Sequence, residues 1–408
     1  MKYIPRHMER KFLHMNDFFK VILLTGARQV GKTTMLKHLS TDQERTYVSL
    51  DNRMARELAK TDPVLFFQTY KPPILIDEVQ YAPELFEQIK IMCDDSSQTG
   101  IFWLTGSQHF NLMKNVQETL AGRIGILELH GFSQTEKDGI KFKNDLDFSL
   151  EYLQSRQAQT VKNNLQKVYE HIWRGGYPQV LSADDEQQKE YYNSYINTYI
   201  MRDVIDLGGV TDTRRFFKFT TACAALISQQ LNYKTLAESS DISEPTAKEW
   251  LRLLSGLGIV YLLEPYSNNA LKRLTKTPKL YFYDTGLAAH LSMWLTQETL
   301  MNGAASGHFF ENYVLMELLK NYSVSASTAK LTYFRDSNAK EIDIFVERNN
   351  FIHPLEIKKS ANPDRREIKK FAVLDKTTVQ IGAGGIICMC EEPIPIDENN
   401  CFIPCNLI

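Results

Sequence analysis

One run near the N-terminus constrains this chain more than any other: Gly26-Ala27-Arg28-Gln29-Val30-Gly31-Lys32-Thr33, followed by Thr34. It fits the pattern G-x-x-x-x-G-K-[ST], the P-loop, without a mismatch. The apolar residues 21–24 before it predict a buried strand, and the residues from Thr34 onward predict a helix. In that setting the backbone amides of the run face a phosphate chain, Lys32 reaches its outer phosphates and the Thr33 hydroxyl joins a Mg²⁺ shell. The run therefore predicts ATP as ligand and Mg²⁺ as cofactor.

A second segment, Ile74-Leu75-Ile76-Asp77-Glu78, has the Walker B arrangement of a buried strand that ends in carboxylates. Asp77 at the strand end is expected to hold Mg²⁺ through water, and Glu78 to polarise the attacking water as general base. The adjacent glutamate predicts a hydrolase rather than a protein that only binds nucleotide. Glu78 and Lys32 are thus candidate catalytic residues.

Residues 1–140 read as alternating strands and helices, which predicts an α/β domain with a parallel sheet. The expected strands are 21–24, 47–50, 74–76, 101–104 and 126–129. Ligands of such sheets bind at the carboxyl ends of the strands. The first domain is therefore predicted to be a P-loop NTPase sheet with its nucleotide at that edge.

Two further residues of this domain are candidates for catalysis. Ser107, with Gln108 as second choice, follows a predicted strand at the position of the sensor residue in AAA-type ATPases. The alternative interpretation of Ser107 is a helix N-cap. Arg123 could stabilise transition-state charge in cis or in trans, as an arginine finger does. The alternative interpretation of Arg123 is a surface arginine.

The composition fits a globular enzyme. A chain of 408 residues predicts about two to three domains. The formal net charge of −2 gives no bulk electrostatic reason for nucleic-acid binding, so such a partner would need a local basic face. The N-terminus has no apolar signal core, and no run of about 18 apolar residues occurs. We therefore expect a cytoplasmic protein without a membrane partner.

The middle region, 141–275, is predicted to be helical and to contain a winged-helix layout. Residues 141–160 are polar with little periodicity and suggest an exposed connection. Further on, a helix, a turn, a second helix at about 244–254 and a strand at 259–263 follow one another. The exposed face of the second helix carries Lys248, Glu249 and Arg252, a mixed set of charges. DNA binding and a protein-contact role both stay open.

A second set of charged residues occurs in the C-terminal region, 276–408. Glu311 lies on a predicted helix, Asp343 on a predicted strand, and Glu356 and Lys358 at the end of the next strand. This ordered set is typical of the PD-(D/E)XK nuclease fold, in which the carboxylates hold Mg²⁺ or Mn²⁺ and the lysine orients water. Glu311, Asp343 and Glu356 are thus candidate metal ligands and Lys358 a candidate catalytic residue. The alternative is a set of solvated charges or a salt bridge.

Four of the six cysteines lie near the C-terminus, at positions 388, 390, 401 and 405. Their C-x-C and C-x-x-x-C spacings differ from the usual zinc-binding pair C-x-x-C. We expect reduced cysteines packed in strands rather than a zinc site.

These segments together resemble one prokaryotic family. The matching residues are 3–6, 23–34, 77–80, 105–108, 120–123, 175–178 and 354–360. Members of that family are identified as AAA-type ATPases joined to a C-terminal domain of unknown function with a restriction-endonuclease-like fold. The resemblance implies a P-loop domain that binds ATP with Mg²⁺, a winged-helix-like region and a C-terminal α/β domain of the restriction-endonuclease type. It names no biological substrate.

Two functional classes follow from the sequence. The first is an ATP-regulated nuclease that acts on DNA. The second is a regulatory or signalling ATPase whose later domains bind a protein partner, nucleic acid or a second copy of the chain without cleavage. The basic residues of 358–370 favour the first class slightly, whereas a blocked groove beside Glu311, Asp343 and Glu356 would favour the second.

Overall fold

The chain forms two compact units, which we describe separately. The computed structural model describes residues 3–41, 43–107, 116, 118–141, 145–162, 164–206, 210–267, 277–336, 340–376 and 379–408, without the side chains of 203, 206, 375 and 376. Gln108, the second sensor candidate, lies outside these ranges. One unit comprises Lys2–Phe132 with Gly256–Ile259, and the other comprises Ser133–Ser255 and Val260–Ile408.

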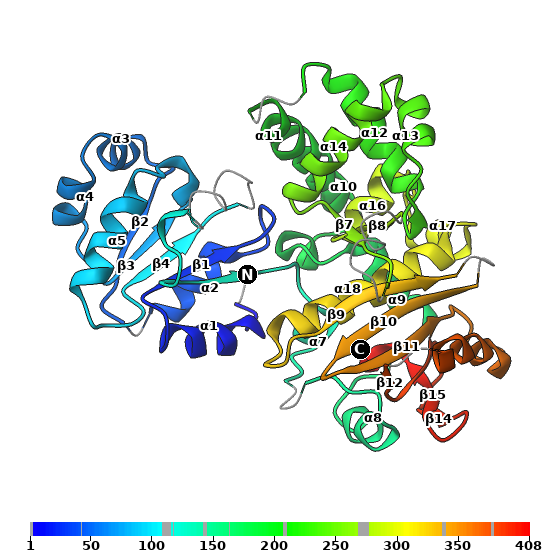
Figure 1. The fold of residues 1–408 in the computed structure, drawn as a ribbon. Coiled ribbons are helices and arrows are strands. Elements are labelled where there is room, and N and C mark those ends of the chain that lie inside the picture. The colour runs from blue at the N-terminus through cyan, green and yellow to red at the C-terminus, as the bar shows by residue number, and fades with distance from the viewer. Residues whose placement is uncertain are drawn as a thin grey trace. The chain divides into compact units, whose positions relative to one another are not determined.

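The first unit is an α/β domain with a five-stranded parallel sheet (Figure 1). Its elements are α1 (Met8–Asn16), β1 (Val21–Thr25), α2 (Lys32–Leu39), β2 (Thr46–Ser49), α3 (Arg53–Thr61), α4 (Pro63–Thr69), β3 (Ile74–Asp77), η1 (Val79–Tyr81), α5 (Leu85–Asp95), β4 (Phe102–Thr105) and β5 (Ile124–Glu128). The strand order is β2-β3-β4-β1-β5, and every pair is parallel. All five predicted strands are confirmed.

Burial explains why these runs became strands. Every residue of β1, β3 and β4 is buried, because these three central strands have helices on both faces and neighbours on both sides. Such strands read as continuous apolar runs, which made them recognisable in the sequence. Their parallel arrangement brings the residues that follow β1, β3 and β4 to one edge of the sheet.

The second unit contains the rest of the described helices and strands. They are α7 (Gln134–Lys137), α8 (Leu150–Gln157), α9 (Leu165–Arg174), η2 (Pro178–Ser182), α10 (Asp185–Tyr195), η3 (Ile196–Ile200), α11 (Met201–Asp206), α12 (Thr213–Ala225), β6 (Gln229–Gln230), α13 (Tyr233–Ser240), α14 (Glu244–Gly256), β7 (Val260–Leu263), β8 (Lys279–Phe282), α16 (Thr285–Leu291), α17 (Gln297–Asn302), α18 (Ser306–Val324), β9 (Lys330–Arg335), β10 (Glu341–Arg348), β11 (Phe351–Ile357), η4 (Arg365–Lys376), β12 (Gln380–Ile381), β13 (Gly384–Cys388), β14 (Ile394–Pro395), β15 (Asn400–Pro404) and η5 (Cys405–Leu407).

Two sheets organise this unit. A small antiparallel sheet has the order β6-β8-β7; β6 lies between α12 and α13 in the chain, and β7 and β8 follow α14. The larger sheet runs β14-β15-β13-β11-β10-β9, with β9, β10 and β11 antiparallel and β11, β13 and β15 parallel. The backbone of Tyr266, just after β7, donates to the carbonyl of Tyr333 on β9, which joins the two sheets.

Helix α18 connects the small sheet to the large one. Much of the helix is buried, and it packs beside β11. The Asn312 side chain bonds to the backbone of β8 as a neighbouring strand would. Its Oδ1 accepts from the Phe282 amide at 2.7 Å, and its Nδ2 donates to the Phe282 carbonyl at 2.8 Å. Helix α18 and strand β8 are therefore held in fixed register.

A buried carboxylate organises the break after α9. Gly175 adopts φ +78°, and a Cβ there would lie 2.4 Å from Asp284 Oδ1. Asp284 accepts from the Gly176 amide, the Tyr192 hydroxyl and the Leu287 amide, the last as N-cap of α16. Two aromatic side chains of α10, Tyr192 and Tyr195, are buried in the core of this unit.

The expectation of an exposed connection at 141–160 holds only in part: several of the described residues 145–160 are exposed, but the segment includes a helix and buried side chains. Leu146 and Phe148 are buried, and Leu150–Gln157 form helix α8 with Leu153 buried. Arg348 holds this segment against β10, because its guanidinium donates to the Leu146 carbonyl and to Asp147. Leu146 and Phe148 alternate with polar residues, so this short stretch looks polar in the sequence although every second side chain packs inward.

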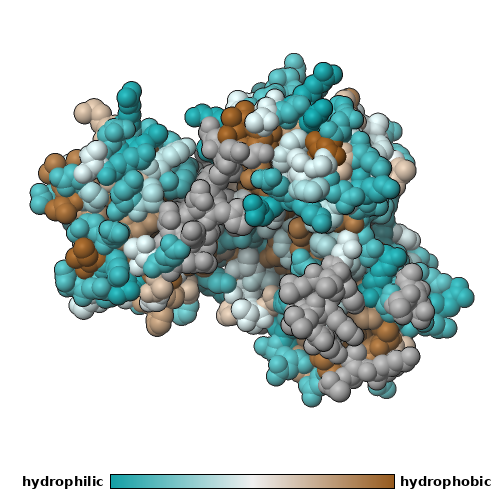
Figure 2. All heavy atoms as spheres, turned by 45° about the horizontal axis from the view of Figure 1, so that its top comes forward, coloured by the Kyte–Doolittle hydropathy of each residue, from teal (hydrophilic) through white to brown (hydrophobic). Residues whose placement is uncertain are grey.

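On the face shown in Figure 2, hydrophilic side chains cover most of both units, and hydrophobic ones form small separate patches. Among the described residues, no helix has the length and apolar character needed to cross a bilayer. All six cysteines are free, and only Cys390 is partly exposed.

Candidate functional site

The P-loop of the first unit depends on two glycines. Gly26 follows β1 with φ +139°, and a Cβ on it would lie 2.1 Å from the carbonyl oxygen of Leu129. Gly31 adopts φ +98° as the residue before α2. Only glycine reaches these conformations without strain. The run from Gly26 to Thr33 therefore turns sharply between β1 and the N-terminus of α2, as the sequence predicted.

Lys32 is held inside this turn. Its Nζ donates to the carbonyls of Gly26 at 3.0 Å and Ala27 at 2.8 Å. Burial lowers the pKa of Lys32 to about 8; Glu78 and Asp77 oppose this shift, and Arg28 adds to it. A cation that is desolvated in this way gains by meeting an anion at the loop. Thr34, two residues after Lys32, is exposed.

Asp77, at the carboxyl end of β3, accepts hydrogen bonds from three hydroxyl groups. The Thr33 hydroxyl donates to Asp77 Oδ1 at 2.6 Å, and the Thr105 hydroxyl donates to the same oxygen at 2.5 Å. Tyr47 on β2 donates to Asp77 Oδ2 at 3.3 Å. The structure thus joins Thr33 and Asp77, as predicted, and adds Thr105 and Tyr47, which sequence reasoning missed.

Glu78 follows Asp77 with a left-handed backbone, φ +58°. Its amide donates to the Thr105 hydroxyl at 3.2 Å, and its carboxylate accepts from Gln80. Thr105 therefore fixes both halves of the Asp77-Glu78 pair. Ser107 lies two residues beyond and is buried, and its Oγ has no partner among the described residues.

Arg6 supports the P-loop from outside it. Its guanidinium donates to the Val30 carbonyl at 2.9 Å and to the His130 carbonyl at 2.6 Å, and it lies over the Phe132 ring. Arg6 is 6% exposed. Sequence reasoning gave Arg6 no role, although residues 3–6 are among the segments that resemble the prokaryotic family.

Arg123 does not reach the nucleotide edge of its own sheet. Its carbonyl accepts from the Val21 amide at the amino end of β1, about 13 Å of strand away from the P-loop. Its guanidinium forms a two-point ion pair with Asp94, at 2.7 and 3.1 Å. The hypothesis of an arginine finger in cis is therefore corrected: strand direction places Arg123 at the opposite edge.

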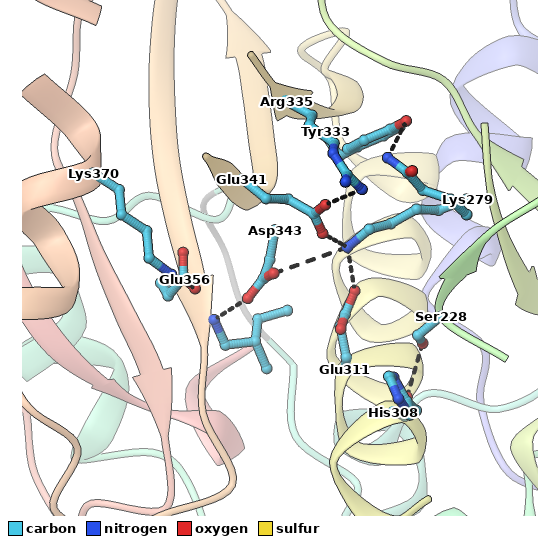
Figure 3. A network of polar contacts seen from close by, with 12 residues as sticks. Ser228, Lys279, His308, Glu311, Tyr333, Arg335, Glu341, Asp343, Glu356 and Lys370 are labelled. Atoms are coloured by element: carbon cyan, nitrogen blue, oxygen red, sulfur yellow. Dashed lines mark hydrogen bonds and ion pairs between the residues drawn. The ribbon is translucent and has the colours of Figure 1, made fainter. Parts of the chain in front are cut away.

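The predicted C-terminal carboxylates gather around a lysine that the sequence analysis did not consider. Lys279 Nζ lies 3.1 Å from Glu311 Oε1, 2.6 Å from Glu341 Oε1 and 3.9 Å from Asp343 Oδ1 (Figure 3). Tyr281 also donates to Glu311, at 2.6 Å. Burial opposes the charge on Lys279, but Glu311, Asp343 and Glu341 together raise its pKa above the ordinary value.

Glu356 forms the other part of this region. It is 1% exposed, and its Oε1 accepts from Lys358 at 2.9 Å and from Lys370 at 2.7 Å. Burial, and the neighbouring Asp343, raise the pKa of Glu356 to about 7, while Lys358 and Lys370 act in the opposite direction. Burial likewise raises the pKa of Glu311 to about 7. The pairing register of β10 and β11 places Asp343 near Glu356, and Asp343 accepts from the Ile357 amide at 2.9 Å.

The structure thus places Glu311, Asp343, Glu356 and Lys358 in one region, but as an ion-pair network. Within the described ranges, no three His, Cys, Asp or Glu side chains form a group that could hold a metal ion. The basic stretch after β11 is also partly internal, since Lys358 and Lys370 pair with Glu356, and Lys359 donates to the Met301 carbonyl.

Comparison with known proteins assigns parts of the chain. Residues 18–137 match the family model described as an AAA domain. Residues 165–298 and 306–408 each match a domain of unknown function, DUF8612 and DUF4143. Together with the P-loop and the parallel sheet, the first match identifies an AAA-type P-loop ATPase domain in the first unit.

Similar proteins and structures extend beyond this domain. An uncharacterized protein of Mycobacterium tuberculosis is 27% identical over 391 residues, which is 95% of this chain and 80% of that protein. An uncharacterized protein of Methanocaldococcus jannaschii is 22% identical over 77% of this chain and 72% of its own length. Among solved structures, a Walker-type ATPase of Pyrococcus abyssi is similar with a TM-score of 0.44 and 16% identity, over 71% of this chain and 96% of that one. The RuvB Holliday junction branch migration motor of Thermotoga maritima has a TM-score of 0.32 and 16% identity, over 63% and 89%.

Proposed function

We propose that this chain is a Mg²⁺-dependent ATP hydrolase. The observation that carries the proposal is the pair of hydrogen bonds that joins the Thr33 hydroxyl, Asp77 Oδ1 and the Thr105 hydroxyl at the carboxyl edge of the sheet. Hard oxygen donors of this kind suit Mg²⁺, which commonly takes one or two protein ligands and completes its shell with phosphate and water. Thr33 and Asp77 would hold the ion, and the ion would neutralise charge on the phosphates.

The P-loop residues would bind the phosphate chain. The backbone amides of 26–34 and the N-terminus of α2 offer donors to anionic oxygens. Lys32 would exchange its bonds to the Gly26 and Ala27 carbonyls for bonds to phosphate oxygens. Because its ammonium is already desolvated, little further dehydration accompanies that exchange.

Glu78 would accept a proton from the attacking water. Its carboxylate is positioned by Gln80 and its backbone by Thr105, so that its direction is set before substrate binds. Ser107 stays a candidate for contact with the terminal phosphate, because its buried hydroxyl lies just beyond β4. Arg123 stays a candidate arginine finger only in trans.

Exchange of Glu78 for glutamine tests this function. Glu78→Gln should keep ATP binding and lower turnover by roughly 10²–10⁴-fold, because the amide cannot take the proton. Glu84→Gln, an exposed neighbour, is the matched control and should turn over normally. Lys32→Ala should lose both binding and turnover. Wild-type rates in Glu78→Gln would remove the proposed base.

For the second unit, we propose a winged-helix element followed by a PD-(D/E)XK-like domain. The order α12, β6, α13, α14, β7, β8 with a three-stranded antiparallel sheet supports the first. The order α18, β9, β10, β11, with Asp343 on β10, Glu356 on β11 and Lys358 directly after β11, supports the second. The exposed face of α14 carries mixed charge, which suits a protein partner at least as well as DNA.

A second function, non-cleaving regulation, is favoured by one specific observation. Lys279 is buried among Glu311, Glu341 and Asp343, so these carboxylates already pair with a cation of the chain. We therefore propose that this domain binds a partner or nucleic acid without cleavage while Lys279 is in place. The test is cleavage of single-stranded, duplex and branched DNA and of RNA with Mg²⁺ or Mn²⁺, with and without ATP. Cleavage that Glu356→Ala abolishes would instead establish the ATP-regulated nuclease.

A further inference from the structure

Lys279 is the first residue of β8, yet only 3% of it is exposed. Its ammonium meets carboxylates from two separate elements: Glu311 from α18, and Glu341 and Asp343 from β10. Glu341 and Asp343 are two positions apart on a strand and so share one face of the sheet. Three acidic side chains thus converge on one point, and the group at that point is a cation.

The surrounding contacts fix the carboxylates around that point. Tyr281 donates to Glu311, and the Ile357 amide donates to Asp343 Oδ2. Arg335 lies 3.4 Å from Glu341 Oε2. These donors hold the acidic groups in place independently of Lys279, as Figure 3 shows for Arg335 and Glu341.

A second observation points to a ligand in the same region. Glu356 is buried, and both of its lysine partners bond to Oε1, while Oε2 has no partner among the described residues. In the view of Figure 3, Asp343 lies between Lys279 and Glu356. A buried carboxylate oxygen without a donor is costly, and a cation beside it would remove that cost.

We propose that the Lys279 ammonium is a tethered counter-ion, which stands where a divalent cation would otherwise bind among Glu311, Asp343 and Glu356. This inference rests on the proposed function of the same C-terminal region. With Lys279 in place the side chains do not fit a metal ion, as the described residues contain no such ligand group. Displacement of β8, which carries Lys279, would convert the cluster into a site for Mg²⁺ or Mn²⁺, since oxygen ligands of this kind are those that these ions take.

The simpler alternative is a structural ion-pair network with no capacity for metal. In that case the removal of Lys279 leaves buried carboxylates that protonate or unfold the domain, and no metal affinity appears. The two alternatives differ in Mn²⁺ binding, which can be measured without any cleavage assay.

The experiment measures Mn²⁺ binding to the full chain without nucleotide, by the electron paramagnetic resonance signal of the free ion. Lys279→Met is compared with Lys279→Met/Asp343→Asn, and wild type with Asp343→Asn, so that Mn²⁺ bound at the P-loop cancels in each pair. Asp343→Asn should change nothing in the wild-type background. In the Lys279→Met background it should weaken binding at least tenfold, which is about 1.4 kcal/mol.

Two further variants protect the test against a failure to fold. Lys279→Met/Glu341→Gln keeps the net charge of the cluster and should gain the same Asp343-dependent affinity. Lys279→Arg keeps the cation and should gain none. Thermal unfolding with and without Mn²⁺ identifies which variants are folded, and Mn²⁺ should raise the Tm of those that gained the site.

Each outcome decides the inference. Asp343-dependent binding in wild type as tight as in Lys279→Met would overturn it, and would at the same time strengthen the case for a metal-dependent nuclease. No gain in either Lys279→Met or Lys279→Met/Glu341→Gln would also overturn it. A gain in Mn²⁺ affinity without cleavage of any nucleic acid would support the counter-ion role while the nuclease proposal fails.

Discussion

Replacement of Asp284 by alanine should destabilise the second unit severely. This carboxylate is 7% exposed and accepts three hydrogen bonds: from the Gly176 amide at 2.6 Å, the Tyr192 hydroxyl at 2.8 Å and the Leu287 amide at 2.8 Å. It thereby joins the break after α9, the middle of α10 and the start of α16. No other residue in the described part of the chain accepts from all three of these donors.

The magnitude follows from the bonds that are lost. A hydrogen bond to a charged group contributes about 1.5–3 kcal/mol net, and losses within one network add only in part. Asp284→Ala also leaves the Gly176 amide buried without this acceptor, whereas the Tyr192 hydroxyl keeps the Arg174 carbonyl, at 2.8 Å, as an acceptor. We expect the free energy of unfolding to fall by about 4 kcal/mol. Asp284→Asn keeps an acceptor oxygen and should lose about 2 kcal/mol.

Urea unfolding followed by tryptophan fluorescence measures this loss, because Trp173 and Trp294 lie in the same unit and are joined by a hydrogen bond. Asp185→Ala is the matched control: it removes an aspartate that pairs with Arg174 at the surface and should lose less than about 1 kcal/mol. The reasoning is refuted if Asp284→Ala loses no more than Asp185→Ala.

Two more predictions concern catalysis and pH. Thr105→Val removes the hydroxyl that bonds both Asp77 and the Glu78 amide, so ATP turnover should fall by roughly 10–100-fold with ATP affinity little changed. Thr61→Val, at an exposed position, is the control. A normal rate in Thr105→Val would contradict the positioning role. Burial, with help from nearby lysines, lowers the pKa of His171 to about 3, below the ordinary value of 6.5. The folded state then binds fewer protons than the unfolded state, so stability present above pH 6.5 is lost as pH falls, by about 2 kcal/mol between pH 7 and 5. His171→Gln should flatten that part of the stability–pH curve, and an unchanged slope would show that His171 titrates normally.

Local patterns predicted much of the first unit. Each central strand is buried on both faces, so its apolar run is visible without any knowledge of its neighbours. The P-loop is likewise encoded in consecutive residues. The position of Arg123 followed from the expected parallel sheet rather than from its motif, because a residue just before the strand at 126–129 lies at the amino edge, opposite the P-loop, and the parallel pairing of β1 with β5 places it there.

The C-terminal region shows where sequence reasoning ends. Asp343 and Glu356 lie on consecutive strands of a hairpin, so their proximity could be inferred from a short turn. Lys279 comes from a different sheet, 32 positions before Glu311. One signal was available: Lys279 and Tyr281 alternate within a strand whose every residue is buried, and a buried lysine requires an acidic partner.

The double hydrogen bond of Asn312 to Phe282 gives the small sheet a thermodynamic connection to the acidic cluster. Strand β8 cannot separate from α18 unless both bonds break. The arrangement in which β8 is bonded to α18 is therefore a discrete state rather than one of a continuous series of positions of β8. A partner that prefers the small sheet with β8 released would raise the affinity of the cluster for a divalent cation. By reciprocity, the cation would raise the affinity for that partner by the same factor. Either ligand could then be titrated to report on the other.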